Sequence, residues 1–203
     1  LDRVHEAFPE AFLDNHVSLV TRIYHYPRRF FHDGEDQGET QVMGDPRSTY
    51  DVDEKDRKIL KSLRRNARQK TVEVARDIDV SERVVRYRMK QMEEADVILA
   101  YRALPDLPAL GRLYYKVHFQ LNKQDEGTRR RVQRYAEQEP TVTYLTEAVG
   151  GPDLELEYQV ESSRELYEKI DALIGDNPGL IRDYNVLLYD KEYQLSYFNK
   201  ITV

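Results

Sequence analysis

The cationic side chains with the clearest spacing lie between residues 81 and 94. On a helical wheel of roughly 100° per residue, Val85, Met89 and Met92 form one apolar seam. The opposite face carries Arg83, Arg86, Tyr87 and Lys90. Arginine can donate two parallel hydrogen bonds to a guanine edge, and lysine can bind a phosphate. This segment therefore has what a helix needs to recognise double-stranded DNA, and the alternative interpretation is an ordinary solvated helix face.

Three polar residues at the starts of the neighbouring predicted helices extend this candidate interface. Thr71, preceded by Lys70, is expected to cap the second helix, and Ser81 is expected to cap the third. Side chains of these types can also contact phosphates. Arg88 lies on the flank of the third helix, closer to its apolar seam, and is predicted to make either a phosphate contact or a structural one.

The charge of this region is opposite in sign to that of the whole chain. From Lys55 to Lys90 there are 13 Lys and Arg against five Asp and Glu, a net charge of +8. The 203-residue chain has a net charge of −6, which leaves −14 for the remaining residues. A positive block that the rest of the molecule does not share indicates a polyanionic partner.

The elements that must position these residues are predicted to form a winged helix-turn-helix. The buried positions of its first two helices are expected to be Ile59, Leu60, Leu63, Val72, Ala75 and Ile78. Asp79-Val80 forms the turn, and the third helix runs from Ser81 to about Glu94. The β-rich stretch Val97–Leu104 is predicted to form a wing or a lead strand.

After residue 105 the pattern changes to strands and helices in alternation. One strand is expected to bury Leu113, Tyr115, Val117, Phe119 and Leu121. The next strand pattern has Glu155, Glu157, Gln159 and Glu161 facing water. A helix over about 125–138, a helix whose buried positions run from Leu166 to Ile174, and strands over 141–149 and about 181–198 complete the order β-α-β-β-α-β. The last strand can have a break near Asp190. The predicted fold class is thus α+β, a winged helix-turn-helix followed by a ferredoxin-like sandwich.

From Asp53 onward the chain resembles the Lrp/AsnC family of transcription regulators. The resembling stretches are DEKDRKILKSLRRNAR, VSERVVRYRMKQMEEADVI and AVGGPDLELEYQV, and the resemblance covers about 150 residues. It implies a sequence-specific DNA-binding regulator that forms homodimers through the sandwich, and these often assemble into higher homo-oligomers. It also implies a small effector, usually an amino acid, bound between sandwich domains.

The resemblance places that effector near the loop between the second and third sandwich strands. Gly150 and Asp153 match family positions, whereas Gly151 and Pro152 depart from the usual polar or acidic residue followed by a variable one. The backbone N–H groups of Gly150 and Gly151 could face a carboxylate, and Asp153 could accept an ammonium group. The alternative interpretation is a tight turn whose aspartate caps the loop.

Residues 1–32 are not expected in a minimal member of the family. They combine a short helical pattern with an extended one, which weakly resembles the end of the sandwich. They are predicted to be either the end of a preceding sandwich unit in a longer parent or an extension that packs on the dimer. Residues 33–50 are predicted to be a linker, 51–104 the DNA-binding domain, and 105–203 the effector-binding and dimerisation domain.

The residue pattern does not favour an enzyme. The chain has no P-loop, GxGxxG or GxSxG motif, no cysteine, and no HxH or HxxxH pair. No cofactor or metal is therefore predicted, although His25 and His32 together remain a weaker metal hypothesis. The alternatives are a sirohaem decarboxylase of similar architecture and a DNA-free effector-sensing or assembly partner. The lack of cysteine and of any apolar run of about 20 residues favours a cytoplasmic protein with no membrane partner.

Overall fold

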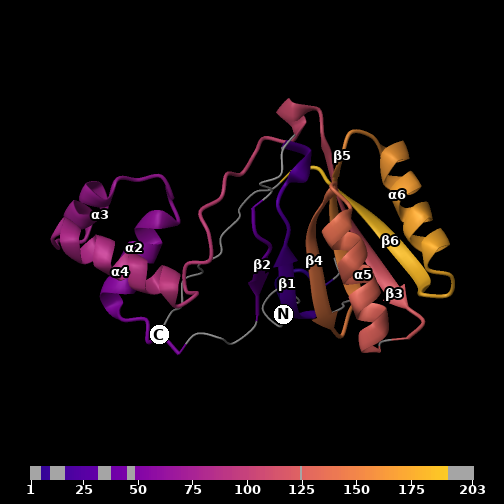
Figure 1. Ribbon diagram of the computed structural model, residues 1–203, viewed down its shortest axis with the longest axis horizontal. Coiled ribbons are helices and arrows are strands. Elements are labelled where there is room, and N and C mark those ends of the chain that lie inside the picture. Colours follow the sequence, from indigo (N-terminus) through magenta and orange to yellow (C-terminus); the bar gives the residue numbers. More distant parts are fainter. Residues whose placement is uncertain (1–5, 10–16, 32–37, 45–48, 124, 192–203) are drawn as a thin grey trace. The chain divides into compact units, whose positions relative to one another are not determined.

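The computed structural model divides the chain into two compact units and describes residues 6–9, 17–31, 38–44, 49–123 and 125–191 (Figure 1). The sheet unit combines residues from Leu1–Gly44 with Leu107–Tyr189, and the helical unit contains Asp45–Asp106. The helical unit is therefore inserted between two parts of the sheet unit. Among the described residues, no helix is both long and apolar enough to cross a membrane.

Three helices form the helical unit, namely α2 (Glu54–Leu63), α3 (Thr71–Asp77) and α4 (Glu82–Glu94). The residues buried between them are Ile59, Leu63, Val74, Ala75, Val85 and Met92. Most of the predicted seam is thus confirmed, with Met89 half-buried at its edge. Val72 was predicted to be buried but is 45% exposed. It lies about 200° around the helix from Val74, which takes the buried position instead.

In the helical unit, α3 and α4 are each followed by an aspartate with a left-handed backbone. Asp79 has a φ of 57° and Asp96 a φ of 54°. Beyond Asp79, the N–H of Val80 donates to the carbonyl of Ala75 at 3.0 Å, which closes the end of α3 and forms the turn before α4. The aspartates therefore take the position that glycine usually occupies at a helix end.

The same kind of turn explains why the predicted wing strand is missing. No strand forms between Val97 and Leu104, a stretch that is described throughout. The N–H groups of Val97 and Ile98 donate to the carbonyl of Met92 at 2.8 and 3.0 Å. Both side chains pack against the helical core. The apolar residues that favoured a strand are used to close the end of α4.

The sheet unit contains a ferredoxin-like β-α-β-β-α-β arrangement, as predicted. Its elements are β3 (Leu113–Leu121), α5 (Glu126–Gln138), β4 (Val142–Val149), β5 (Leu154–Val160), α6 (Ser163–Asp176) and β6 (Ile181–Tyr189). The strands lie in the order β6-β3-β5-β4 and all pair antiparallel. Strand β6 ends at Tyr189, which agrees with the break expected near Asp190, and residues 192–198 lie outside the described part of the chain.

Both helices cover one face of this sheet (Figure 1). Every second residue of β3 from Tyr115 to Leu121 is buried against them, together with Val132 of α5 and Ile170 of α6. This confirms the period-2 pattern of the predicted strand. The side chain of Leu113, at the strand's start, is 37% exposed.

The opposite face of β5 corrects the prediction that its polar residues all face water. Glu155, Glu157 and Gln159 are buried, and only Glu161 is exposed. The Nζ atom of Lys116 lies 2.9 Å from a Glu155 oxygen and 3.0 Å from a Glu157 oxygen. Burial lowers the pKa of Lys116, but the two carboxylates outweigh this effect and raise it. Cross-strand pairing thus allows charged residues to be buried where alternation alone suggested solvent.

Two strands from the N-terminal part of the chain widen the sheet. Strand β1 (Leu19–His25) pairs antiparallel with β4, and β2 (Gln41–Met43) pairs with β1. Strand β2 lies inside the segment predicted to be a linker. Strand β1, from the segment 1–32, therefore joins the sheet of its own chain and supplies hydrogen-bond partners to the edge of β4. Most of the predicted N-terminal helix lies outside the described residues.

Arg29 attaches this N-terminal segment to the end of α5. Its guanidinium donates to the carbonyl oxygens of Ala136 at 3.1 Å, Glu139 at 3.0 Å, and Glu137. The last carbonyls of a helix lack partners within the helix and carry the negative end of its dipole. A cation at this position satisfies both requirements and connects the first strand to the helical layer.

Replacing Arg29 should therefore loosen the N-terminal segment. We expect Arg29→Gln to lower the free energy of unfolding of the sheet unit by about 2 kcal/mol, because hydrogen bonds from a charged donor are lost. Chemical denaturation followed by circular dichroism measures this change. The control Arg164→Gln removes an exposed arginine from α6 and should change the same quantity by less than about 0.5 kcal/mol. Equal effects at the two positions would contradict the anchoring role.

Candidate nucleic-acid interface

Helix α4 packs by one side and presents cationic side chains on the other. Val85 and Met92 are fully buried. The residues predicted to contact DNA on the outer face are all exposed, namely Arg83, Arg86, Tyr87 and Lys90. Exposure reaches 68% for the side chain of Arg86 and 74% for that of Lys90. The helix that the sequence predicted thus exists, with the predicted faces.

Two of these cations have acidic partners one turn away on the same helix. Arg86 donates to one Glu82 oxygen through Nη2 at 2.6 Å and Nε at 3.0 Å. The Nζ atom of Lys90 lies 3.5 Å from a Glu94 oxygen. Exposed pairs of this spacing contribute only a few tenths of a kcal/mol. The looser Lys90–Glu94 pair can therefore be exchanged for a contact with a phosphate at little cost.

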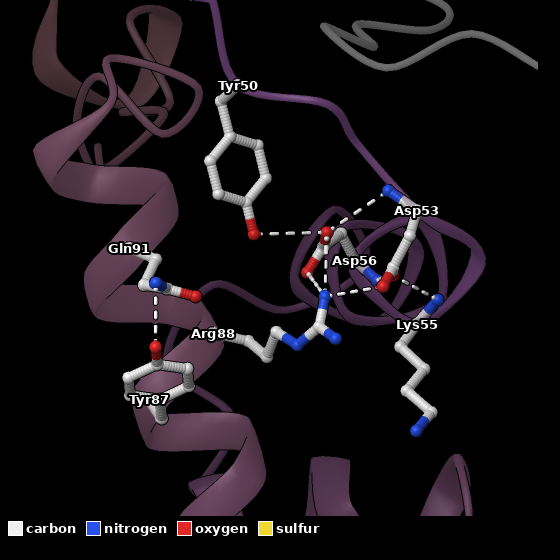
Figure 2. Close-up of polar contacts among 7 residues, drawn as sticks. All are labelled: Tyr50, Asp53, Lys55, Asp56, Tyr87, Arg88 and Gln91. Carbon is white, nitrogen blue, oxygen red and sulfur yellow. Dashed lines mark hydrogen bonds and ion pairs between the residues drawn. The ribbon is translucent and has the colours of Figure 1, made fainter.

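Arg83 and Tyr87 occupy the same outer face. Gln91 donates a hydrogen bond to the Tyr87 hydroxyl oxygen at 2.9 Å (Figure 2). The Tyr87 ring is 61% exposed, so it can contact a sugar or a base edge. Arg83 is exposed and forms no salt bridge with another described residue.

The polar residues at the starts of α3 and α4 differ in the contacts that they make. Ser81 caps α4 as predicted, although its hydroxyl accepts the N–H of Val84 at a long 3.4 Å. Thr71 was predicted to cap α3, but Lys70 has the extended backbone of the cap and Thr71 is the first helical residue. The Thr71 hydroxyl instead donates to Glu82 at 2.7 Å and links α3 to the start of α4. Lys70 is exposed, as a phosphate contact requires.

Arg88 extends from the inner flank of α4 toward the beginning of α2 (Figure 2). Its Nη1 atom donates to Asp53 at 2.6 Å and to both oxygens of Asp56 at 3.1 Å. Asp56 is fully buried, and the Arg88 side chain is 24% exposed. Of the two roles predicted for Arg88, the structure shows the structural one.

The same two aspartates begin α2. Asp53 accepts the N–H groups of Lys55 at 2.8 Å and Asp56 at 3.0 Å, and Asp56 accepts the N–H of Asp53 at 3.1 Å. The Tyr50 hydroxyl also donates to Asp56 at 3.1 Å. The backbone hydrogen bond from Asp56 lowers the pKa of Asp53, and Arg88 lowers it further. In turn, the hydrogen bond to Asp53 raises the pKa of Arg88.

This cluster of Asp53, Asp56 and Arg88 was not predicted from the sequence. The signal was nevertheless present, because an aspartate followed three residues later by a second acid, just before an apolar run, is a helix-start pattern. Its connection to Arg88 joins residues 35 positions apart in the sequence, and no local pattern contains that contact.

The predicted effector loop is a tight turn closed by its aspartate. Asp153 accepts the N–H of Leu121 at 2.7 Å and donates its own N–H to the carbonyl of Phe119 at 3.0 Å. Gly150 has a φ of +87°, which favours glycine. These contacts match the alternative interpretation of the loop.

The N-terminal segment also lies against this loop. A Cβ atom on Gly150 would lie 2.7 Å from the carbonyl oxygen of Val17, and one on Gly151 would lie 2.8 Å from the Cβ of Ser18. One side of the two glycines is therefore already in contact with residues that lead into β1. The structure thus brings Gly150, Gly151 and Asp153 together in one loop.

The metal hypothesis finds no cluster within the described part of the chain. No group of three or more His, Asp or Glu residues there could hold a metal ion. The buried His25 ring stacks on Tyr144, with centroids 4.0 Å apart. His32, its hypothetical partner, lies outside the described residues.

Comparison with known proteins agrees with this geometry. Residues 52–98 match a family model described as winged helix-turn-helix DNA-binding. The HTH-type transcriptional regulator FL11 of Pyrococcus horikoshii is 29% identical over 129 residues, which cover 64% of this chain and 83% of that protein. The chain is therefore similar to proteins named as HTH-type transcriptional regulators, and it carries a winged helix-turn-helix match over residues 52–98.

Two solved structures show the shared fold. The transcriptional regulator NMB0573 of Neisseria meningitidis, in complex with L-Met, has a TM-score of 0.64 and 21% identity, covering 72% of this chain and 95% of its own. AsnC of E. coli has a TM-score of 0.60 and 22% identity, covering 73% and 99%. The family model over residues 52–98 and the named relative support a DNA-binding transcription regulator, and the two solved structures show the shared fold.

The two neighbouring arginines of α4 should differ sharply in their effect on stability. We expect Arg88→Ala to lower the free energy of unfolding of the helical unit by about 3 kcal/mol, because it leaves the buried Asp56 carboxylate without its cation. The matched control Arg86→Ala removes an exposed ion pair and should cost about 0.5 kcal/mol. Hydrogen exchange of peptides from α2 and α4, measured by mass spectrometry, separates the helical unit from the sheet. Similar protection in both variants would contradict the structural role of Arg88.

Proposed function

We propose that this protein is a transcription regulator of the Lrp/AsnC type, which binds specific duplex DNA sites by placing the outer face of α4 in the major groove. The observation that carries the proposal is the exposed cationic face on a helix whose other side is fully buried. Arg83 and Arg86 would contact base edges, and Tyr87 and Lys90 would contact bases or backbone. Lys70 and Ser81 would contact phosphates, while Thr71 would act through its hydrogen bond to Glu82.

We further propose that the protein works as a homodimer that forms higher homo-oligomers. On the sheet face opposite α5 and α6, Leu187 and Tyr189 of β6 are 42% and 39% exposed. A second sheet would cover such a face. Two recognition helices related by a twofold axis would then enter successive major grooves, about 10 base pairs apart.

The regulator role fits the residues better than either alternative. A sirohaem decarboxylase would need a basic, histidine-bearing pocket, but in the β3–β6 part of the chain the one histidine, His118, lies 3.8 Å from Glu155. A DNA-free sensor would have no use for the exposed cations of α4. The proposal therefore includes no enzymatic activity and no cofactor, and places the protein on DNA in the cytoplasm.

An amino-acid effector is the finer part of the proposal. Its support is the fold shared with NMB0573, which was solved with L-Met. The turn containing Gly150, Gly151 and Asp153 would line the site. Because Val17 and Ser18 contact these glycines from one side, the effector would have to approach the turn from its other side.

DNA binding should depend on the outer arginines of α4. We expect Arg83→Ala/Arg86→Ala to weaken binding to a selected duplex at least about 100-fold, since each base contact is worth about 1–3 kcal/mol. Electrophoretic retardation across a salt series measures this change, and wild-type affinity should fall steeply with salt.

The control for this experiment removes the same charge elsewhere. Arg130→Ala/Arg134→Ala takes two exposed arginines from α5 in the sheet unit and should leave DNA affinity within about twofold. Both variants should keep the wild-type oligomeric state. Unchanged DNA binding by the α4 variant would count against the proposed function.

Effector binding is testable without DNA. We expect one or a few members of a panel of twenty amino acids to raise the unfolding temperature of the protein, because a ligand that binds only the folded state stabilises it. Asp153→Asn should reduce that increase by weakening the contact with the ammonium group, while Asp183→Asn, on exposed β6, should not. A response that is the same in both variants would place the effector away from this turn.

A further inference from the structure

Glu82, the first residue of α4, is an acid in the middle of the surface proposed to meet DNA. One of its carboxylate oxygens accepts three hydrogen bonds, from the Thr71 hydroxyl at 2.7 Å and from Arg86 Nη2 and Nε at 2.6 and 3.0 Å. A negative charge at this position repels phosphates and reduces affinity for any DNA sequence. An acid at this position therefore needs an explanation other than affinity for DNA.

The geometry of the Arg86 guanidinium provides such an explanation. Glu82 takes the Nε edge of Arg86, which leaves the edge formed by Nη1 and the second proton of Nη2 directed elsewhere. That remaining edge still offers two parallel donors, the arrangement that matches the acceptors of guanine. Because the Arg86 side chain is 68% exposed, the edge is accessible to a partner.

Thr71 fixes Glu82 in turn. It belongs to α3, so the chain Thr71–Glu82–Arg86 connects the recognition helix to the helix before it. A long side chain that is ordered before binding loses less conformational entropy when it binds. The hydrogen bonds from Thr71 and Arg86 lower the pKa of Glu82, so it stays a carboxylate near neutral pH.

The second acid–base pair of α4 lacks these features. Lys90 and Glu94 approach only to 3.5 Å, and their side chains are 74% and 64% exposed, whereas Glu82 is 39% exposed. An ammonium group is also a point charge with no planar edge to orient. Glu94 therefore supplies a matched control, an acid of equal charge on the same helix without a positioning role.

We infer that Glu82 is a positioning residue, which holds Arg86 in the conformation that recognises a guanine and makes α4 selective at that base. This inference rests on the proposed function and assigns a cause for selectivity within it. Thr71 takes part through Glu82 and not through a contact with DNA.

The test compares sequence preference among variants of the full chain. Duplexes are selected from a random pool by the wild type and by Arg86→Ala, and the base position whose preference disappears in Arg86→Ala identifies the Arg86 contact. Affinity is then measured at fixed salt for the selected duplex and for the same duplex altered at that base. We expect Glu82→Gln to reduce the preference at that position about tenfold, while its affinity for the altered duplex rises a few-fold because a repelling charge is gone.

Two controls separate positioning from simple charge and from folding. Glu94→Gln should raise affinity for both duplexes by a similar factor and keep the preference. Thr71→Val retains the Glu82 charge and should lower the preference at the Arg86 position by a smaller factor, with an unchanged unfolding temperature. In an Arg86→Ala background, Glu82→Gln should have no further effect on preference.

The outcomes are distinguishable. If the wild type selects no sequence, the proposed function fails and this inference fails with it. If the wild type selects a site but Glu82→Gln behaves like Glu94→Gln, or weakens preference equally at all positions, the regulator role stands and the positioning role of Glu82 is overturned.

Discussion

The ion pair between Arg88 of α4 and the two aspartates at the start of α2 is the contact on which the DNA-binding surface depends. Removing charges from water is costly, and Asp56 is fully buried, so the pair is stable only while all of its hydrogen bonds are made. Those bonds include the first N–H groups of α2, the Tyr50 hydroxyl and the Arg88 guanidinium (Figure 2). The cluster therefore couples the start of one helix to the rotation of another. With Arg88 held inward, Arg83 and Arg86 must lie on the outer face.

Periodicity in the sequence was sufficient to predict the helices of the helical unit, the seam of Val85 and Met92, and the order of the ferredoxin-like elements. These features depend on which face of a local element is apolar, and local spacing carries that information. The predictions that were wrong concern contacts between elements. Val97 and Ile98 have strand propensity, yet their N–H groups close the end of α4. Glu155 and Glu157 follow the strand alternation that predicts exposure to solvent, yet Lys116 on the neighbouring strand allows them to be buried.

The same distinction applies to the candidate site. The types of side chain on the outer face of α4 were evident from spacing, but their partners were not. Thr71 fits a helix cap by type, and only the fold shows its hydroxyl bound to Glu82. Arg88 differs from Arg86 by two positions, and its role follows from Asp53 and Asp56, which precede it by more than 30 residues. The N-terminal strands were likewise missed as part of the sheet because β1 pairs with β4, more than 100 residues away. This pairing places the helical unit between two segments of the chain that both belong to the sheet unit.

The most direct test of the two faces of α4 follows its arginine side chains by NMR while duplex DNA is added. The Nε–H resonances of Arg83 and Arg86 should shift in proportion to the bound fraction, because the proposal places both guanidinium groups against the duplex. The Arg88 resonance should remain in place, since Nη1 of its guanidinium stays bound to Asp53 and Asp56. A shift of Arg88 together with unchanged signals from Arg83 and Arg86 would contradict the division of α4 into an inner structural face and an outer DNA-binding face.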